Sequence, residues 1–400
     1  MGYEGTLKYI NLNLQASGRK DSRYLPALTG LRFFLALWVI LHHLTGKDMM
    51  LEPWTEAAPG IVRTLLHGGY LAVQAFFILS GFVLARSYTS TRWTRQNVIK
   101  FGVARFARIY PVYLFSLVAV SVFIAETLAK PTRTVAEKAG LLGYYVFVLQ
   151  GWRGSLGVGW NTPAWTLSCE FFFYACFPVL FYWMRDARLP KILAAFAISI
   201  VTPILLAHAG VPWDWKPIHH LSDFLAGIAA AGLFDILWRL RGRGYLVYVP
   251  VTAAALWFIL NTWVFKGTLI DLNTVLRPLY VLLLIGVGLG DRYFAALFAW
   301  KPVEYLGKAS YCMYILHVPA LWWYSRYKPF SWGASEFLVI VLVVSVAAFE
   351  LVETPANNRI RGWSVQLSEC QWSLWAPSHT TASKPLTEKS IACSEEPALT

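Results

Sequence analysis

Long apolar runs, separated by short polar or basic segments, repeat along the 400-residue chain. A helix needs about 20 apolar residues to cross a bilayer, and on that measure we predict ten transmembrane helices. We place them near residues 25–45, 67–86, 109–127, 162–184, 190–209, 221–238, 245–265, 274–290, 310–327 and 336–356. A further apolar run at 139–151 is too short to cross and is predicted to be re-entrant or interfacial. The pattern predicts an all-α polytopic membrane bundle.

Composition agrees with a membrane protein. Hydrophobic residues make up 57% of the chain and charged residues only 14%, against about 25% charged in typical soluble domains. The 19 Trp and 20 Tyr suit membrane–water interfaces, where aromatic rings concentrate. We therefore expect a multi-pass integral membrane protein, located in the cytoplasmic membrane if the source is bacterial.

The net charge of +13 follows from topology rather than from a nucleic-acid surface. If the N-terminus is cytoplasmic, 23 of the 35 Lys and Arg lie in inside segments, 10 lie outside, and Arg32 and Arg277 lie within spans. Cytoplasmic loops carry an excess of Lys and Arg in membrane proteins. The distribution favours ten spans with both termini in the cytoplasm, and we expect no nucleic-acid partner.

The chain is predicted to have one membrane domain at 25–361, with a cytoplasmic N-terminal tail at 1–24 and a polar, disordered cytoplasmic tail at 362–400. The first apolar run is full length and lacks an Ala-x-Ala-like cleavage site, so it is interpreted as a signal anchor. The five cysteines show neither disulfide-framework nor metal-ligand spacing. The scattered histidines likewise suggest no ligand set, so no metal and no permanently bound cofactor is predicted.

The first span, LTGLRFFLALWVILHHLTG, contains ionisable residues that lipid disfavours. A charge at the centre of a membrane helix costs about 2.5–3.5 kcal/mol on insertion scales, so it usually faces a partner or a wet cavity. Arg32 and His43 are eleven positions apart, which places them within about 20° of one face and about 16.5 Å apart along the axis. His42 points about 100° away. The alternative is that the two histidines only anchor the helix at the outer interface.

Two arginines mark the cytoplasmic start of the predicted third span. Arg105 and Arg108 are three residues apart and share a helical face. The arginine fork matches phosphate oxygens, and a helix N-terminus adds backbone donors. A phosphate-bearing ligand or the phosphates of lipids would both fit this pair.

Glu170 lies inside the apolar fourth span, where a carboxylate needs a partner. Ser168, two positions earlier, lies on a different face. A carboxylate near a histidine commonly holds its tautomer and stabilises its charged form. The alternative is a structural ion pair, for example with Arg32.

Several other polar residues lie in predicted spans. Ser80 and Gly81 are small enough for close helix–helix approach, and Arg277 is expected to snorkel to the interface. Asp223 is ionisable and lies near the outer end of its span. Ser310, Tyr314 and His317 recur at helical spacing on one face, and the last span ends with Glu350, Glu353 and Arg359.

Six motifs follow one another in a characteristic order. They are an Arg and a His separated by ten residues in the first span, then FFILSG, RFARIYP, AWTLSCE, SYCMYILH and VETP. In this order they resemble the acyltransferase 3 family of integral-membrane acyltransferases, which includes O-antigen, capsule and Nod-factor O-acetylases and macrolide acyltransferases. The resemblance covers about residues 24 to 362. One departure is Thr166, where the family commonly has Ser.

The resemblance implies transfer of an acyl group, with acetyl expected, from cytoplasmic acyl-CoA to a hydroxyl of a cell-surface or exported glycan. It implies that Arg105 and Arg108 receive the CoA phosphates and that Arg32 holds CoA or the thioester. His43 would act as general base or carry the acyl group, and Glu170 would orient His43 or balance its charge. Supporting roles are expected for Ser80, Ser168, Ser310, Tyr314, His317 and Glu353.

Other functions are compatible with the same residues. The acceptor could be a lipid or a secreted small molecule, and a transporter or flippase would also place ionisable residues inside its spans. The lack of an evident inverted repeat counts against a transporter. Release of CoA that depends on an acceptor would distinguish a transferase from a transporter.

Overall fold

The computed structural model describes residues 24–46, 49–153, 159–261, 272–327 and 333–362, and this part of the chain is helical with no strand. The predicted tails at 1–24 and 362–400 therefore lie almost entirely outside the described residues. Eight described helices are long and apolar enough to cross a membrane. Their bounds are α2 (Pro26–Leu44), α4–η1–α5 (Gly60–Ser87), α6 (Arg95–Ala119), η2–α9 (Thr162–Met184), α10 (Leu189–His208), α11–η3 (Lys216–Leu240), α13 (Leu272–Leu289) and α17 with its continuation (Ala334–Gly362). Within the composite segments, the main helices are α5 (Ala72–Ser87), α9 (Trp165–Met184), α11 (Lys216–Ile236) and α17 (Ala334–Ala348).

Two further helices occupy the remaining predicted spans. They are α12 (Tyr245–Leu260), which has 16 residues, and α16 (Ser310–Tyr327), which has 18 residues but is more polar. Short helices link the long ones, and α8 (Val135–Val146) covers most of the run predicted to be re-entrant or interfacial. Its 12 residues extend about 18 Å, too little to cross a bilayer.

The predicted third span has the wrong bounds. We expected it at 109–127, but α6 begins at Arg95 and ends at Ala119, and α7 (Ser121–Ala129) follows after a break. The Thr94 side chain accepts a hydrogen bond from the backbone N–H of Asn97 at 3.3 Å and caps the helix. Such a cap starts a helix before its apolar part begins. Arg105 and Arg108 consequently lie well inside α6, not at its start.

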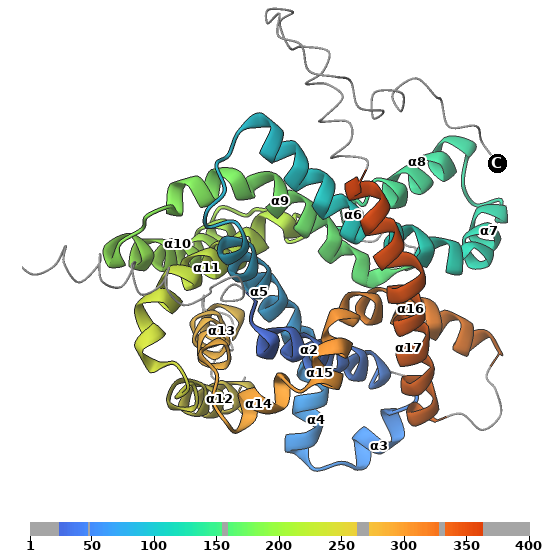
Figure 1. Cartoon of the computed structure of the whole chain (residues 1–400). Coiled ribbons are helices and arrows are strands. Elements are labelled where there is room, and N and C mark those ends of the chain that lie inside the picture. The colour runs from blue at the N-terminus through green and yellow to red at the C-terminus, as the bar shows by residue number, and fades with distance from the viewer. Residues whose placement is uncertain (1–23, 47–48, 154–158, 262–271, 328–332, 363–400) are drawn as a thin grey trace, which may run out of the picture.

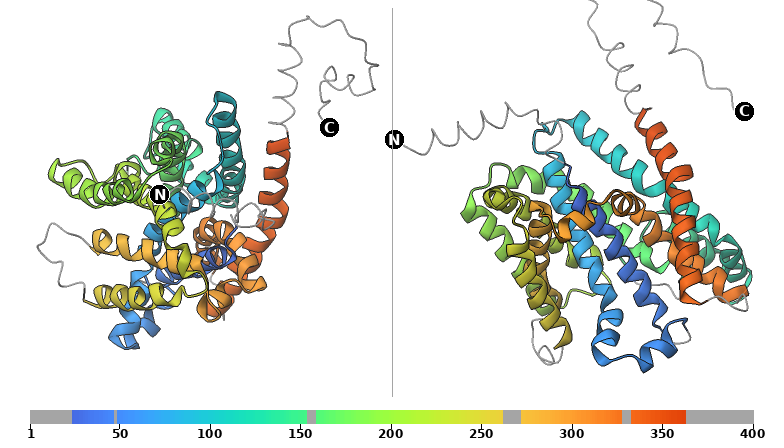
Figure 2. Two further views of the ribbon diagram at one scale, coloured as in Figure 1. Left: turned by 60° about the vertical axis from the view of Figure 1, so that its left-hand side comes forward. Right: turned by 60° about the horizontal axis from the view of Figure 1, so that its bottom comes forward.

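The helices form one bundle (Figure 1). The first span and α5 make a hairpin, with α3 (Glu52–Ala57) and α4 (Gly60–His67) at its turn (Figure 2). α5 also packs tightly on α11, because a Cβ at Gly81 would collide with the Phe224 carbonyl oxygen and one at Gly227 with that of Ile78. Glycine thus permits the backbone contact that was expected near Ser80 and Gly81.

Large apolar side chains remain exposed around the bundle. Val179 on α9, Leu205 on α10 and Val343 on α17 are exposed by 72, 61 and 61%. Exposed apolar surface on this scale is rare in soluble monomers but is what lipid-facing helices present. With the apolar helices, this surface is that of a multi-pass integral membrane protein.

The two ends of the bundle differ in chemistry. At one, called here the basic end, a cavity is lined by Arg86, Arg105, Arg108, Lys308 and Arg361. At the other, the histidine end, α2 finishes with His42 and His43 close to His67. Tyr24 and Arg361, near the two ends of the described chain, line the same basic cavity. Both ends of the described chain therefore lie at the basic end of the bundle.

The end of α17 departs from α-helical geometry. Phe349–Glu353 (η5) is a π-helical turn. Such turns are rare and frequently accompany functional sites. Here the turn brings the Glu353 side chain into the core, where it is 2% exposed.

Candidate active site

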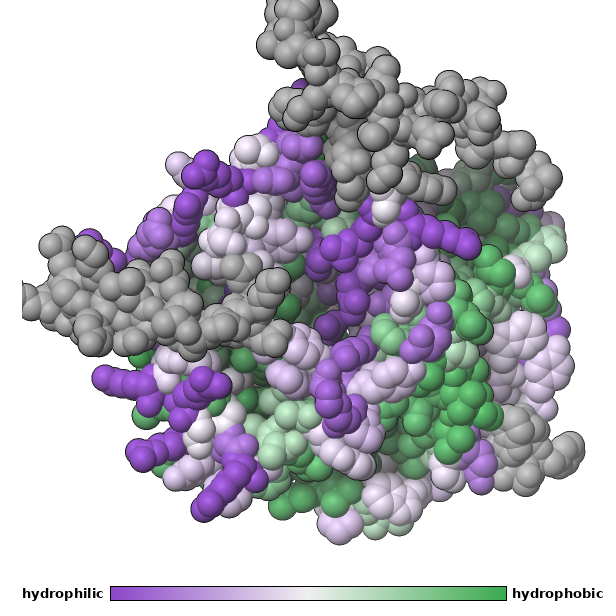
Figure 3. Space-filling view, in the orientation of Figure 1, coloured by the Kyte–Doolittle hydropathy of each residue, from purple (hydrophilic) through white to green (hydrophobic). Residues whose placement is uncertain are grey.

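The basic cavity has a volume of about 330 Å3. No Asp or Glu within the described residues lines it, whereas six cationic side chains do: Arg32, Arg86, Arg105, Arg108, Lys308 and Arg361. Hydrophilic residues gather between α5 and α6 on the face seen in Figure 3. A cavity with walls of one charge sign concentrates ligands of the opposite sign. This cavity is therefore suited to an anion with several charges.

Carboxylates outside the cavity hold three of its cations, and Arg86 is one of them, paired with Asp235 at 2.8 Å. Arg108 pairs with Glu353 (Nη1–Oε1, 2.9 Å), and the Cys312 thiol donates to the other oxygen of Glu353 at 3.3 Å. Lys308, at the end of α15 (Lys301–Lys308), donates to Glu304 at 2.8 Å. This hydrogen bond raises the pKa of Lys308, so the lysine is cationic at neutral pH.

Arg105 has a different environment. Its Nε is buried and has no hydrogen-bond partner among the described residues, and its guanidinium carbon lies 5.8 Å from the centre of the Phe101 ring. An unsatisfied buried donor is costly. Arg105 is therefore the arginine of this pair that is best placed to donate to a ligand.

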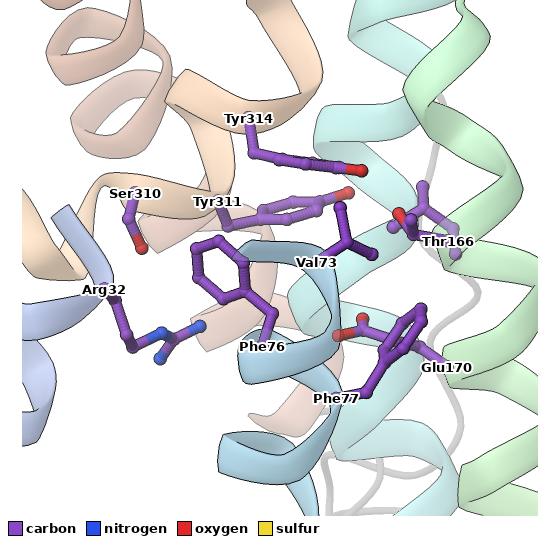
Figure 4. Close-up of a pocket in the computed structure, with 10 residues that line it drawn as sticks. Arg32, Val73, Phe76, Phe77, Thr166, Glu170, Ser310, Tyr311 and Tyr314 are labelled. Carbon is purple, nitrogen blue, oxygen red and sulfur yellow. The ribbon is translucent and has the colours of Figure 1, made fainter. Parts of the chain in front are cut away.

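A second cavity, called here the inner pocket, lies between α2, α5, α9 and α16 and has a volume of about 50 Å3. Its polar lining comprises Arg32, Thr166, Glu170, Ser310, Tyr311 and Tyr314. Its apolar lining comprises Val73, Phe76, Phe77 and Leu167. Figure 4 shows these side chains converging from the four helices. Arg32 lines both cavities and marks the boundary between them.

Glu170 lies among cations rather than beside the catalytic histidine that we expected it to orient. The positive charges that act on it most are those of Arg32, Arg108 and Arg105. His43 instead hydrogen-bonds through Nδ1 to the Val39 carbonyl oxygen at 2.9 Å. Arg32 is the charge that acts most strongly on Glu170, although no ion pair joins the two side chains within the described residues. The backbone of α2, through the Val39 carbonyl, orients His43.

His43 faces a second histidine. Its ring centre lies 4.9 Å from that of His317 on α16. His317 Nδ1 also contacts a backbone oxygen, that of Tyr314, at 2.7 Å. Because a carbonyl only accepts, each Nδ1 must carry the proton, and each neutral ring keeps its lone pair on Nε2. His317 Nε2 is buried and has no hydrogen-bond partner among the described residues.

His42 points elsewhere, as the helical spacing predicted. Its ring centre lies 5.7 Å from that of Tyr70, and its Cβ lies where a side chain at Gly69 would have to go. His42 therefore packs against η1 (Gly68–Leu71), whereas His43 packs against α16.

The supporting serines have different surroundings. Ser310 lines the inner pocket, and its buried Oγ has no hydrogen-bond partner within the described part of the chain. Ser168 accepts from the Gly151 backbone N–H at 2.9 Å and donates to the Val148 carbonyl at 2.6 Å, so it holds the segment after α8. Ser80 lies beside Tyr174, which in turn lies beside Glu170.

A buried polar cluster outside both cavities was not foreseen. Arg277 was expected to snorkel, but it is buried and donates from Nε to Asp223 Oδ1 at 2.6 Å. Gln74 donates to the same oxygen at 2.9 Å, and His220 Nδ1 contacts Oδ2 at 2.9 Å. The sequence does show two ionisable residues in predicted spans, Asp223 and Arg277. Sequence spacing does not show, however, that the helices carrying them pack together. The same limitation concealed Phe76 and Tyr174.

Within the described residues, no group of three or more His, Cys, Asp or Glu side chains is placed to hold a metal ion. Cys169 and Cys312 are buried free thiols, and Cys370 and Cys393 lie outside the described residues.

Comparisons with known proteins match most of the membrane region. A family model described as an acyltransferase domain matches residues 25–350. The acyltransferase MdmB of Streptomyces mycarofaciens is 32% identical over 58% of this chain and 62% of that protein. The O-acetyltransferase OatA of Staphylococcus aureus is 22% identical over 84% of this chain and 58% of that protein.

The peptidoglycan O-acetyltransferase OatA of Listeria monocytogenes is 23% identical over 86% of this chain and 58% of that protein. The matched region thus covers 58 to 62% of the length of these curated relatives. No solved structure is significantly similar to the chain.

Proposed function

The chain belongs to this acyltransferase family, and from that premise we propose that it is a membrane-bound O-acyltransferase with acetyl-CoA as donor. The proposed acceptor is a hydroxyl of a cell-surface or exported glycan. The family supports the reaction class, and the similarity to the Listeria peptidoglycan O-acetyltransferase supports the glycan. The donor is argued from the two cavities.

One observation carries the proposal: Arg32 lines both the basic cavity and the inner pocket. CoA joins a highly charged phosphate portion to a reactive thioester at the far end of a flexible arm. A large basic cavity that meets a small pocket at one arginine fits the two ends of that molecule. In this arrangement Arg32 guides the thioester into the inner pocket, and the carboxylate of Glu170 balances the positive charge of Arg32.

The basic cavity receives the phosphates of CoA. Arginine donates to phosphate in a fork geometry, and Arg105 has an unsatisfied donor beside the cavity. Acyl-CoA is a cytoplasmic metabolite, so the basic end faces the cytoplasm. This orientation is the one that the distribution of Lys and Arg predicts.

The acceptor hydroxyl approaches from the histidine end. Tyr314 lines the inner pocket and lies 6.1 Å, ring to ring, from His317, which in turn contacts His43. His43 Nε2 takes the proton of the acceptor hydroxyl while the hydroxyl oxygen attacks the thioester carbonyl carbon. The C–S bond then breaks, CoA leaves as the thiolate, and the proton passes to that thiolate. General acid–base catalysis of this kind contributes about 10²- to 10⁴-fold.

The test compares cells that produce the wild-type chain, the His43→Ala variant or neither. Mass analysis of the envelope glycans should show one added acetyl group per modified hydroxyl only with the wild-type chain. Membranes from the same cells should release CoA from acetyl-CoA only when the glycan is supplied. CoA release that does not depend on the glycan would contradict the proposed transfer. Acetylation of the glycan without any release of CoA would contradict acetyl-CoA as the donor. These outcomes would favour the transporter or another acyl source.

A further inference from the structure

The inner pocket is small for a ligand site. Its volume is about 50 Å3, whereas pockets that enclose drug-sized ligands measure about 300–1,000 Å3. At this size the inner pocket suits a short acyl group better than a long acyl chain.

The wall that closes the inner pocket comes mainly from α5. Val73, Phe76 and Phe77 follow one another at i, i+3 and i+4, so they share one face of that helix. Figure 4 shows the Phe76 ring in the middle of the group, with Arg32 and Ser310 to one side and Glu170 to the other. Any longer acyl chain would have to displace one of these α5 side chains.

The two phenylalanines differ in how firmly they are held. Phe77 is 2% exposed, and its ring meets those of Phe173 at 5.2 Å, His220 at 5.1 Å and Trp165 at 6.0 Å. Truncating it would open the core between α5, α9 and α11. Phe76 is only partly buried and meets the Tyr314 ring at 6.1 Å. Its ring can be changed with less effect on the surrounding core.

We propose that Phe76 sets the length of the transferred acyl group, admitting acetyl and excluding longer chains by occupying the space they would need. The inference rests on the proposed function, because it takes the inner pocket to be the site of the donor's acyl end. Substitution by a smaller side chain should extend the inner pocket into the space that the Phe76 ring fills. The phosphate contacts of the donor would stay as they are.

The experiment measures the dissociation constants of CoA, acetyl-CoA, propionyl-CoA and butyryl-CoA for the purified full-length chain in detergent, by calorimetry. It compares wild type with Phe76→Ala, the milder Phe76→Leu, and Phe115→Ala. Phe115 is a 38% exposed residue of α6 that lies outside both cavities, so its variant controls for loss of an aromatic ring. No acceptor is needed.

Wild type and Phe115→Ala should bind butyryl-CoA about tenfold or more weakly than acetyl-CoA, the order of effect for forcing methylenes into a filled site. Phe76→Ala should bring the two within about threefold, with Phe76→Leu in between. All four proteins should bind CoA itself alike. Equal affinity for all chain lengths in the wild type, or an unchanged ratio in both Phe76 variants, would overturn the role of Phe76 alone. Failure of every CoA compound to bind would overturn the donor as well.

Discussion

Arg105 and Arg108 look equivalent in the sequence, but the structure gives them different tasks. Arg108 is held by the buried carboxylate of Glu353, whereas the Arg105 Nε lacks a partner within the described residues. A pair of arginines three residues apart therefore contains one residue that stabilises the fold and one that is placed for a ligand. Sequence spacing correctly indicated the shared face, but the partner of Arg108 lies on a helix more than 200 positions later.

We expect Arg105→Gln to raise the KM for acetyl-CoA by about tenfold with little change in thermal stability, because one charge-assisted phosphate contact is lost. Arg108→Gln should instead destabilise the protein by about 3 kcal/mol. This figure is the lower end of the range for a broken buried pair, since the Arg108 side chain is 30% exposed. Initial rates and thermal unfolding in detergent test both effects. An Arg108→Gln protein as stable as wild type would contradict the assignment.

Substitution of the two adjacent histidines should have different effects on acetyl transfer. His43→Ala should reduce transfer by about 10² to 10⁴, the contribution of a positioned general base. His42→Ala, whose ring packs on Tyr70, should keep a substantial fraction of activity. Labelled acetyl transfer at matched membrane levels measures both. An inactive His42→Ala beside an active His43→Ala would reverse the proposed register.

Glu170→Gln keeps the shape of the side chain and removes its charge. Because this charge balances Arg32, we expect transfer to slow by about tenfold, equivalent to about 1.4 kcal/mol. The affinity for CoA should change little, because the phosphates bind in the other cavity. Rates at saturating acetyl-CoA, with a separate binding measurement, test this. Activity within about twofold of wild type would make Glu170 a structural residue only.

At the scale of helices, apolar run length predicted where most of the long helices lie, because burial in lipid requires about 20 apolar residues. It did not predict where α6 begins, since that helix is started by a polar cap outside the apolar run. It also could not show that α5 lies against α11. That contact depends on glycines at Gly81 and Gly227, which pack against each other's helix.

Glycine substitutions provide the test of this packing. Gly81→Ala should cost about 1–3 kcal/mol of stability, the usual cost of overpacking a filled core, because its Cβ would collide with the Phe224 carbonyl oxygen. Gly102→Ala is the matched control. Its Cβ would meet no atom within 4 Å, and alanine favours a helix by about 1 kcal/mol over glycine. Thermal unfolding in detergent should therefore lower the midpoint only for Gly81→Ala.

At the scale of the whole molecule, positive charge gathers at one end of the bundle and histidine at the other. Composition and the distribution of Lys and Arg predicted a polytopic membrane protein and an even number of crossings. They could not predict that Arg32 would join two cavities, because a cavity is a property of four helices together. Arg32, Glu170, Ser310 and Tyr314 could each be singled out in the sequence, whereas Phe76 and the grouping of these residues around one pocket could not.

Cysteine labelling tests the proposed orientation. In a background with the native cysteines replaced by alanine, a cysteine at Asp186, between α9 and α10, should react with a membrane-impermeant reagent only in inside-out vesicles. A cysteine at Asp214, between α10 and α11, should react only in intact cells. Both positions are exposed. The reverse pattern would place the basic end outside the cytoplasm and separate it from acetyl-CoA.

The π-helical turn at the end of α17 adds one residue and so changes which positions of the helix face the core. The core-facing positions of this helix are Phe337, Val341, Ser345 and Ala348, spaced by four, four and three residues, and the next is Glu353 after five. The extra residue lets one continuous helix keep an uninterrupted lipid-facing stripe and still turn a carboxylate inward. A single-residue deletion here would leave the hydropathy profile almost unchanged, yet it would rotate that carboxylate by about 100°. Arg108 would then lose the carboxylate of Glu353 that pairs with it. The short VETP motif therefore depends on its position along the helix as much as on the identity of its residues.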